Sequence, residues 1–366
     1  MTTQLPSESH MESRNIAFSP LVLGAITLKN RFIKAATYEG MYANGIPTQD
    51  LIDFHSRIAR GGTALTTVAY GAVHPDGRTH EEQLLISEAS VPILSELTKS
   101  VHQHGGLASI QLTHCGFFTR NKRMLSGSPM SASRAFNTYG LMSGLPFARA
   151  MSIAEIVEVT NDFARAAMQV KDAGFDALEV HMGHGYLLSQ FLSPSINKRT
   201  DVYGASRSNR MRFPLEVFDA VRRSWPKDRP VAVRISATDW LDDGSGLTGD
   251  DAVEIARTLQ AHACDLVDVS SAGNTPRSQP IYGRMYQVPF ADRIRHEVGV
   301  PVMAVGAILG ADHINTILTA GRADLCALAR PHLTDPYLTL RAATEYEYFD
   351  QAWPAQYLPA KPGPKS

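Results

Sequence analysis

Short apolar runs alternate with longer amphipathic stretches along almost all of this 366-residue chain. Eight of these runs are five to seven residues long, and each is followed by a helical pattern. Runs of this kind are typical of buried parallel strands, because a strand covered on both faces need not alternate polar and apolar positions. We expect the strands at 31–37, 64–70, 107–112, 177–181, 231–236, 266–270, 300–305 and 324–329.

Helical patterns fill the intervals between the expected strands. The best marked begins at Ile153, where Ser152 and Glu155 have the spacing of a capping box and apolar residues recur at helical intervals. We expect the helices at 49–60, 90–104, 152–173, 209–224, 248–262, 288–298 and 310–320, with one more after 333.

This order of elements predicts an α/β fold, a closed (β/α)8 TIM barrel. The rival topology is an open, doubly wound sheet, and eight strand–helix units without a break in composition favour the barrel. A short N-terminal hairpin is expected at 18–30, with Pro20 and Gly24 as turn residues. The connection 114–150, after the third strand, is too long for a simple loop, and we expect it to cap the site.

The chain divides into one barrel domain and two tails. Residues 1–15 are polar and lack the apolar core of a signal peptide, so we expect a disordered N-terminal tail. The barrel domain is expected at 16–350, followed by a C-terminal tail at 351–366 that is rich in proline and lysine.

Charge and cysteine content exclude several function classes. A formal net charge of −1 provides no attraction for nucleic acid or for a membrane surface. The three scattered cysteines, Cys115, Cys264 and Cys326, form neither a zinc motif nor an iron–sulfur motif. No apolar run is long enough to span a bilayer. The sequence therefore predicts a cytoplasmic protein that acts on a small molecule.

Three side chains that can donate hydrogen bonds follow the fourth expected strand. His181, His184 and Tyr186 lie beside Gly183 and Gly185, which allow a ligand to approach closely. An isolated histidine is more often a core residue than a catalyst, and a tyrosine at a strand end often only packs. Three such residues at the carboxyl end of a barrel strand, where active sites of this fold lie, favour a catalytic and substrate-binding site.

Polar residues inside neighbouring strands also require partners. Arg234, in the fifth strand, needs a negative group because a buried unpaired charge is costly. Glu179 or Asp268 would serve, and so would an electron-rich ligand. Gln111 is an amide in an apolar strand, which suits a heterocycle with both donors and acceptors.

Small residues and an arginine at strands seven and eight predict a phosphate site. Gly306 allows backbone N–H groups to approach a phosphate, and Arg330, next to Ala329, can bind it with two parallel hydrogen bonds. Each small residue alone is more often part of a turn. Together with Gln111 and Arg234, they indicate a ring cofactor that carries phosphate.

Two other kinds of site are disfavoured. The segment 244–249 has the spacing G-x-G-x-x-G, but it does not directly follow its strand, and the preceding Asp243 would repel a pyrophosphate. We therefore interpret Thr248 as a helix N-cap. His181 and His184 lack a third ligand for zinc, so no metal site is expected.

Several motifs together resemble those of the old yellow enzyme family, the NADH:flavin oxidoreductases, over residues 17–358. The run from His181 to Gly204 is the most specific. The motifs are Leu28-Lys29-Asn30-Arg31, Ile110-Gln111-Leu112, His181-x-x-His184-Gly185-Tyr186-Leu187, Phe191-Leu192-Ser193-Pro194, Arg199-Thr200-Asp201-x-Tyr203-Gly204, Asn209-Arg210-x-Arg212-Phe213, Tyr286-Gln287-x-Pro289-Phe290 and Gly321-Arg322-Ala323-Asp324.

This resemblance implies FMN at the top of the barrel and ping-pong chemistry. NADH or NADPH would reduce the flavin, and an α,β-unsaturated carbonyl compound, such as an enone or enal, would then be reduced at its C=C bond. His181 and His184 would bind the carbonyl oxygen of the substrate, and Tyr186 would protonate Cα. The cofactor-binding residues that the resemblance implies are Ala35, Ala36, Thr37, Tyr38, Tyr70, Gln111, Arg234, Gly306, Ala329 and Arg330.

One departure from the family pattern leaves alternatives open. Tyr38 stands where the family has a threonine or cysteine against the flavin, which affects the flavin potential and the pocket volume. The alternatives are an oxidative flavoenzyme of the amine dehydrogenase or demethylase type, a flavin-binding protein without turnover if Tyr38 blocks the ring, and, more remotely, a metal-dependent barrel hydrolase. The choice between NADH and NADPH, the natural substrate and a homo-oligomeric state all stay open.

Overall fold

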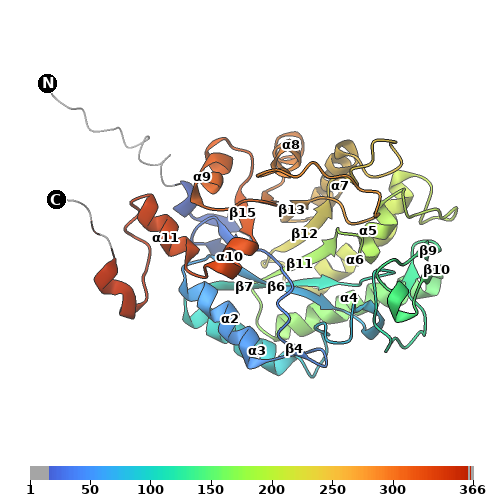
Figure 1. The fold of residues 1–366 in the computed structure, drawn as a ribbon, viewed down its shortest axis with the longest axis horizontal. Coiled ribbons are helices and arrows are strands. Elements are labelled where there is room, and N and C mark those ends of the chain that lie inside the picture. The colour runs from blue at the N-terminus through green and yellow to red at the C-terminus, as the bar shows by residue number, and fades with distance from the viewer. Residues whose placement is uncertain (1–15, 362, 364–366) are drawn as a thin grey trace.

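The computed structural model describes residues 16–361 and 363, so the tail expected at 1–15 lies outside the described residues. Eight parallel strands close into a barrel in chain order, and the last strand pairs with the first, with the helices outside (Figure 1). The predicted (β/α)8 barrel is therefore confirmed. The barrel strands are β3 (Phe32–Lys34), β6 (Leu65–Ala72), β7 (Leu107–Thr113), β11 (Ala177–Met182), β12 (Val231–Ser236), β13 (Leu266–Ser270), β14 (Val302–Val305) and β15 (Leu325–Leu328).

The long helices lie close to their expected positions. The side chains of Ser152 and Thr248 accept hydrogen bonds from the backbone of Glu155 and Asp251, which confirms both predicted N-caps. Among the described residues, no helix is both long and apolar enough to cross a membrane. The helices are α2 (Gln49–Arg60), α3 (Val91–Gln103), α4 (Ile153–Asp172), α5 (Leu187–Leu192), α6 (Arg207–Ser224), α7 (Gly249–Ala261), α8 (Val288–Val298), α9 (Ala311–Thr319), α10 (Arg330–Thr334) and α11 (Leu338–Glu345).

The first barrel strand is shorter than predicted. It ends at Lys34 instead of residue 37, because its pairing with β15 and β6 stops at Lys34, apart from the Ala35 N–H, which donates to the Leu328 oxygen at 3.0 Å. Residues 35–38 consequently leave the sheet and form a loop at its carboxyl end. This is the segment that the sequence assigned to the flavin.

A hairpin covers the amino-terminal end of the barrel. Its strands, β1 (Leu21–Leu23) and β2 (Ile26–Leu28), pair antiparallel, which confirms the expected hairpin. Leu23 and Leu28 belong to the same buried cluster as Leu65, Leu266 and Leu325, which lie at the starts of barrel strands. The hairpin therefore fills this end of the barrel with apolar side chains.

The connection after β7, residues 114–150, is called the capping segment below. It contains a small sheet in which β10 (Phe147–Ala150) pairs with both β8 (Met130–Ser131) and β9 (Ala135–Phe136), and this sheet lies to one side of the barrel (Figure 1). The Asp76 carboxylate accepts backbone hydrogen bonds at 2.5 and 2.9 Å from Leu125 and Ser126, which ties the segment to the loop after β6. The remaining short elements are η1 (Ile16–Phe18), β4 (Tyr42–Ala43), β5 (Ile46–Pro47), η2 (Pro75–Gly77), η3 (Leu141–Ser143) and η4 (Ala355–Ala360).

Candidate active site

A turn at the end of β11 brings His181, His184 and Tyr186 together. His184 (φ 56°) and Gly185 (φ 76°) both have left-handed backbone conformations, which reverse the chain just after the strand. A Cβ at Gly185 would lie 2.1 Å from the backbone oxygen of Gly273, so this close approach requires glycine. The ring of His181 lies 5.0 Å from that of His184 and 4.8 Å from that of Tyr186. The structure thus groups the three residues that the sequence grouped.

A directional chain of hydrogen bonds places the protons on both histidines. The Gly183 backbone N–H donates to His181 Nδ1 at 3.2 Å, so His181 carries its proton on Nε2. This Nε2–H donates to His184 Nδ1 at 3.2 Å, and His184 Nε2–H donates to Ser270 Oγ at 2.7 Å. Ser270 Oγ in turn donates to Gln287 Oε1 at 3.3 Å. One backbone donor therefore determines both tautomers.

Both imidazoles are neutral at physiological pH. Burial, with Arg234 nearby, lowers the pKa of His184 to about 3. Burial also places the pKa of His181 well below its ordinary value, and His184 and Arg234 lower it further. The two rings therefore offer N–H donors without positive charge. Here they bond to each other, whereas the sequence led us to expect both to point at one substrate oxygen.

Ser270 is a site residue that we did not predict. The sequence pattern shows it only as the last residue of an expected strand, and the serine pair at 270–271 was the available signal. A hydroxyl can either accept from His184 Nε2 or donate to it. In the second case the His184 proton lies on Nδ1, and His181 and His184 can both donate to a ligand. Ser270 is therefore a positioning residue for His184.

Replacing Ser270 with alanine is expected to shift the tautomer of His184 toward Nε2–H in the ligand-bound protein, because Nε2 loses the hydroxyl that donates to it when Nδ1 donates to the ligand. Long-range ¹⁵N–¹H NMR correlations of the histidine rings report this directly, and a purely structural defect would not change the tautomer. Ser270→Thr should restore the wild-type pattern. The matched control is Ser271→Ala, since Ser271 Oγ bonds to Gln287 Oε1 at 2.6 Å and contacts neither histidine by a hydrogen bond. An unchanged His184 tautomer in Ser270→Ala would contradict this role.

Tyr186 lies in an aromatic wall beside the histidines. Its ring stacks at 5.9 Å on Tyr70 and meets Phe118 edge-on at the same distance. Burial raises the pKa of its phenol, so the hydroxyl keeps its proton at physiological pH. In the described part of the chain, this hydroxyl has no hydrogen-bond partner. The proton is therefore available to a ligand.

Tyr38 extends the same wall toward solvent. Its ring lies 5.7 Å from that of Tyr70 and meets His80 nearly at right angles at 5.2 Å. The side chain is 46% exposed, so nearly half of its surface faces solvent. Tyr38 and Tyr70, both assigned to the flavin from the sequence, are thus neighbours.

Arg234 pairs with a carboxylate inside the barrel. Its Nε lies 3.3 Å from Asp268 Oδ2, so the structure selects Asp268 from the two partners that the sequence offered. The contact lacks hydrogen-bond geometry, and the buried Nε–H has no hydrogen-bond acceptor. Glu179 instead accepts a 2.6 Å bond from Gln111 Nε2. Burial, aided by the nearby Asp268, raises the pKa of Glu179 above its ordinary value.

Two buried charges hold the loop at residues 35–38. Lys34 and Glu39, on either side of it, are both fully buried and form the 2.5 Å ion pair. Burial opposes ionisation of Glu39, but Lys34 and His55 outweigh burial and lower the pKa of Glu39 to about 2. Tyr42 also donates its hydroxyl to Glu39 at 2.9 Å. Ala35, Ala36 and Thr37 are thereby held at the barrel mouth.

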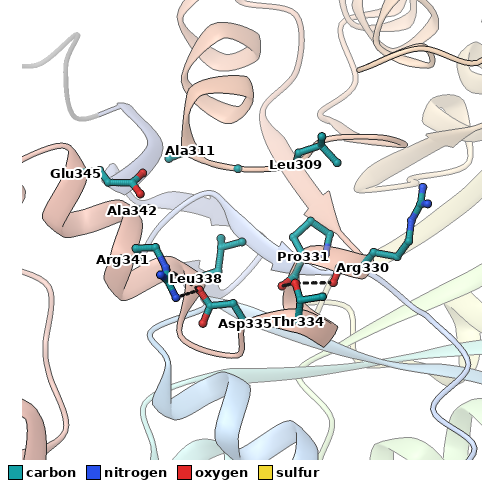
Figure 2. A pocket seen from close by; sticks show the side chains of 11 residues that line it. Leu309, Ala311, Arg330, Pro331, Thr334, Asp335, Leu338, Arg341, Ala342 and Glu345 are labelled. Atoms are coloured by element: carbon teal, nitrogen blue, oxygen red, sulfur yellow. Dashed lines mark hydrogen bonds and ion pairs between the residues drawn. The ribbon is translucent and has the colours of Figure 1, made fainter.

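Gly306, Ala329, Arg330 and Arg234 line one cavity of about 180 Å³. Gly306 has φ +103°, and a Cβ there would lie 2.3 Å from Gln287 Nε2, so a larger residue would clash. The Arg330 side chain extends away from the ion pair between Asp335 and Arg341 (Figure 2). The Arg330 guanidinium has no hydrogen-bond partner among the described residues. An adjoining cavity of about 470 Å³ shares Arg330 and lies between α9, α10 and α11 (Figure 2).

These groups fit the FMN that the sequence implied. Arg234 has an N–H without an acceptor, Gln111 supplies an amide, and Gly306 lines the same cavity as the free guanidinium of Arg330. Small residues and two cations along one cavity suit a polar ring that ends in a phosphate. Among the described residues, no group of three or more His, Cys, Asp or Glu side chains could hold a metal ion.

Known proteins resemble this chain over most of its length. The model of the NADH:flavin oxidoreductase / NADH oxidase family matches residues 17–348. A 4,4'-dithiodibutanoate disulfide reductase of Rhodococcus erythropolis is 36% identical over 367 residues, covering 90% of this chain and 88% of the relative. An NADPH dehydrogenase of Clostridium acetobutylicum is 38% identical over 331 residues, covering 89% of this chain and 94% of the relative.

Solved structures show the same fold. Morphinone reductase in complex with tetrahydroNAD has a TM-score of 0.77 and 25% identity, covering 90% of this chain and 91% of that one. A 2-naphthoyl-CoA reductase has a TM-score of 0.83 and 24% identity, covering 91% of this chain and 52% of the other, and this likeness concerns the fold alone. The family implies FMN as the cofactor and NAD(P)H as the reductant. This chain belongs to the NADH:flavin oxidoreductase / NADH oxidase family, which is the old yellow enzyme family.

Proposed function

We propose that this protein is an FMN-dependent ene-reductase, which takes hydride from NADPH or NADH and reduces the C=C bond of α,β-unsaturated carbonyl compounds. The observation that carries the proposal is the grouping of two neutral imidazoles and one protonated phenol at the end of β11. Reduction of an enone requires donors for the carbonyl oxygen and a proton for Cα, and this grouping supplies both.

His181 and His184 bind the carbonyl oxygen of the substrate. His181 donates from Nε2, the position that the Gly183 N–H fixes. His184 donates from Nδ1 once Ser270 donates to its Nε2, across the 2.7 Å contact that already joins them. These N–H groups belong to neutral rings, and they stabilise the negative charge that develops on the substrate oxygen.

Tyr186 delivers the proton to Cα. When bound, FMN supplies the hydride that it has accepted from the nicotinamide, and this hydride is added at Cβ. The raised pKa of Tyr186 keeps its proton in place until the carbon has become basic. Stacking on Tyr70 holds the phenol ring at the mouth of the barrel. The phenolate then recovers a proton from water.

The remaining residues of the site bind FMN in this proposal. Gln111 and Arg234 face the polar edge of the ring, and Arg234 offsets negative charge on it. The residues that we assign to the ring are Ala35, Ala36, Thr37, Tyr38 and Tyr70, and those that we assign to the phosphate are Gly306, Ala329 and Arg330.

The test is an anaerobic titration of the FMN-loaded protein followed by visible absorbance. We would use NADPH first, because relatives of this chain are named NADPH dehydrogenases. NADPH should bleach the flavin, and 2-cyclohexenone should then restore the oxidised spectrum with saturated ketone as product. Bleaching without reoxidation by the enone would reject the ene-reductase and favour the amine-oxidising alternative, for which Tyr186 need not donate a proton. Failure to bind FMN would reject the whole assignment.

A further inference from the structure

A second cavity, of about 410 Å³, adjoins the reaction site and is called the side cavity below. Phe118 lines it, and the same ring contacts Tyr186 edge-on at 5.9 Å. Gly273 also lines it and packs tightly against the turn of the site, since a Cβ at Gly273 would lie 2.4 Å from His184 Cα. The side cavity and the reaction site therefore share Phe118 and Gly273 as wall residues, and a substrate that extends past Phe118 would reach the side cavity.

The side cavity combines apolar walls with two cations. Its apolar lining includes Phe117, Phe118 and Phe136 of the capping segment. Arg134 lines it from the same segment, and Lys198 lines it from the chain after α5. No aspartate or glutamate is among its lining residues. Such a lining suits an apolar chain that ends in a negative group.

Among the residues that the structure describes, neither cation forms an ion pair with a carboxylate. The Arg134 guanidinium lies 5.6 Å above the Phe147 ring and forms no ion pair within the described part of the chain. Lys198 Nζ donates to the backbone oxygen of Pro194 at 2.6 Å, which leaves two of its three N–H donors. The Lys198 backbone also donates to Ser133 Oγ at 2.8 Å, which joins the two segments.

Three other cations of these two segments pair with carboxylates. Arg123 and Arg149, also in the capping segment, form ion pairs with Glu81 and Glu155. Arg199, next to Lys198 in sequence, lies 2.6 Å from an Asp201 oxygen. Arg120 and Lys122 of the capping segment, like Arg134 and Lys198, form no ion pair among the described residues, but they do not line the side cavity. Arg134 and Lys198 are therefore the cations at which a ligand in the side cavity can supply the counter-ion.

We infer that the substrates of this enzyme carry a carboxylate, which Arg134 and Lys198 bind at the far end of an apolar spacer. The inference rests on the proposed function, because the carbonyl end of the substrate lies at His181 and His184. The carboxylate accepts hydrogen bonds from the guanidinium and the ammonium, and the spacer contacts Phe118. Binding at a distance from the reacting bond also orients that bond.

The experiment compares two probes, 4-(3-oxocyclohex-1-enyl)butanoate and its methyl ester, which differ in charge and by one methyl group. Their saturated counterparts are used for calorimetric titration of the FMN-loaded protein, which needs no turnover. Arg134→Met keeps the apolar stem and removes the charge. We expect its Kd for the saturated acid to rise about tenfold or more and its Kd for the ester to change less than about twofold. Arg134→Lys should restore much of the affinity.

Matched controls separate a local effect from a general one. Lys122 is an exposed cation of the capping segment that does not line the side cavity, so Lys122→Met should leave both Kd values unchanged. Added salt should weaken binding of the acid and not of the ester. Equal effects of Arg134→Met on acid and ester, or none on either, would overturn the inference.

Turnover of the same probes distinguishes this inference from the proposed function. Tight, charge-dependent binding of the acid without its reduction would reject the ene-reductase and leave the carboxylate site standing. Reduction of the ester with no preference for the acid would support the ene-reductase and reject the carboxylate site. A third outcome is that Arg134→Met raises only the KM for NADPH in the reductive half-reaction. The cations would then bind the phosphates of the reductant, and the carboxylate assignment would be wrong.

Discussion

Replacing Tyr186 with phenylalanine is expected to slow the oxidative half-reaction with an enone by about 100- to 10,000-fold, the range that a positioned general acid contributes. Reduction of FMN by NADPH should stay near the wild-type rate, because hydride transfer from the nicotinamide needs no proton from the phenol. Phenylalanine keeps the ring contacts with Tyr70, Phe118 and His181, so the wall itself persists. Anaerobic stopped-flow absorbance measures the two half-reactions separately.

The matched control is Tyr139→Phe. Tyr139 stacks on Phe118 at 4.7 Å and therefore belongs to the same aromatic group, but it has no role in the proposed chemistry. This variant should keep both half-reactions. If Tyr186→Phe slowed both half-reactions equally, Tyr186 would act by shaping the site, and its role as proton donor would be wrong.

Replacing Glu39 with glutamine is expected to lower the free energy of unfolding by about 3–5 kcal/mol, because it leaves the Lys34 ammonium buried without its counter-charge. Both side chains are fully buried, so solvent does not screen this contact. Glutamine still accepts a hydrogen bond from Tyr42, which isolates the effect of the charge. Guanidinium unfolding at saturating FMN measures the change, and an exposed helix residue, Glu158→Gln, serves as the control. A loss below about 1 kcal/mol would contradict the assigned role of the pair.

The pH dependence of stability has a definite sign. The pKa of Glu39 falls from 4.5 to about 2 in the folded protein, so its contribution is complete above pH 4.5 and is lost as the pH falls toward 2. Burial lowers the pKa of His55, which contacts Glu39, from 6.5 to about 4, so stability from this residue is lost between those values on acidification. In Glu39→Gln the slope of stability against pH below 4.5 should therefore be shallower than in the wild type.

The barrel was predictable from the sequence because its strands are local patterns. A run such as Val231–Ser236 is apolar throughout, and helices α4 and α7 begin at capping boxes that a few adjacent residues determine. The short helices were harder. Leu187–Leu192 is too brief for a helical period to show, and it forms because the preceding turn directs the chain back over the barrel.

The site could be predicted only as far as its residues are adjacent in sequence. His181, His184 and Tyr186 fall within one motif, and the structure groups them. Ser270 comes from another strand, and only the closed barrel places it beside His184. Glu39 contacts Lys34 from β3, Ala69 from β6 and His55 from α2, so no single stretch of sequence reveals this group of contacts.

The hairpin at the amino-terminal end of the barrel restricts the route by which small molecules reach and leave the site. Since Leu23 and Leu28 fill that end with apolar side chains, small molecules have to enter and leave through the mouth, past the capping segment. In the proposed reaction, the nicotinamide product has to depart by the same route before a substrate arrives. High concentrations of the reductant would then keep the substrate out of the site. The turnover rate would therefore depend on the ratio of reductant to substrate as well as on the amount of each.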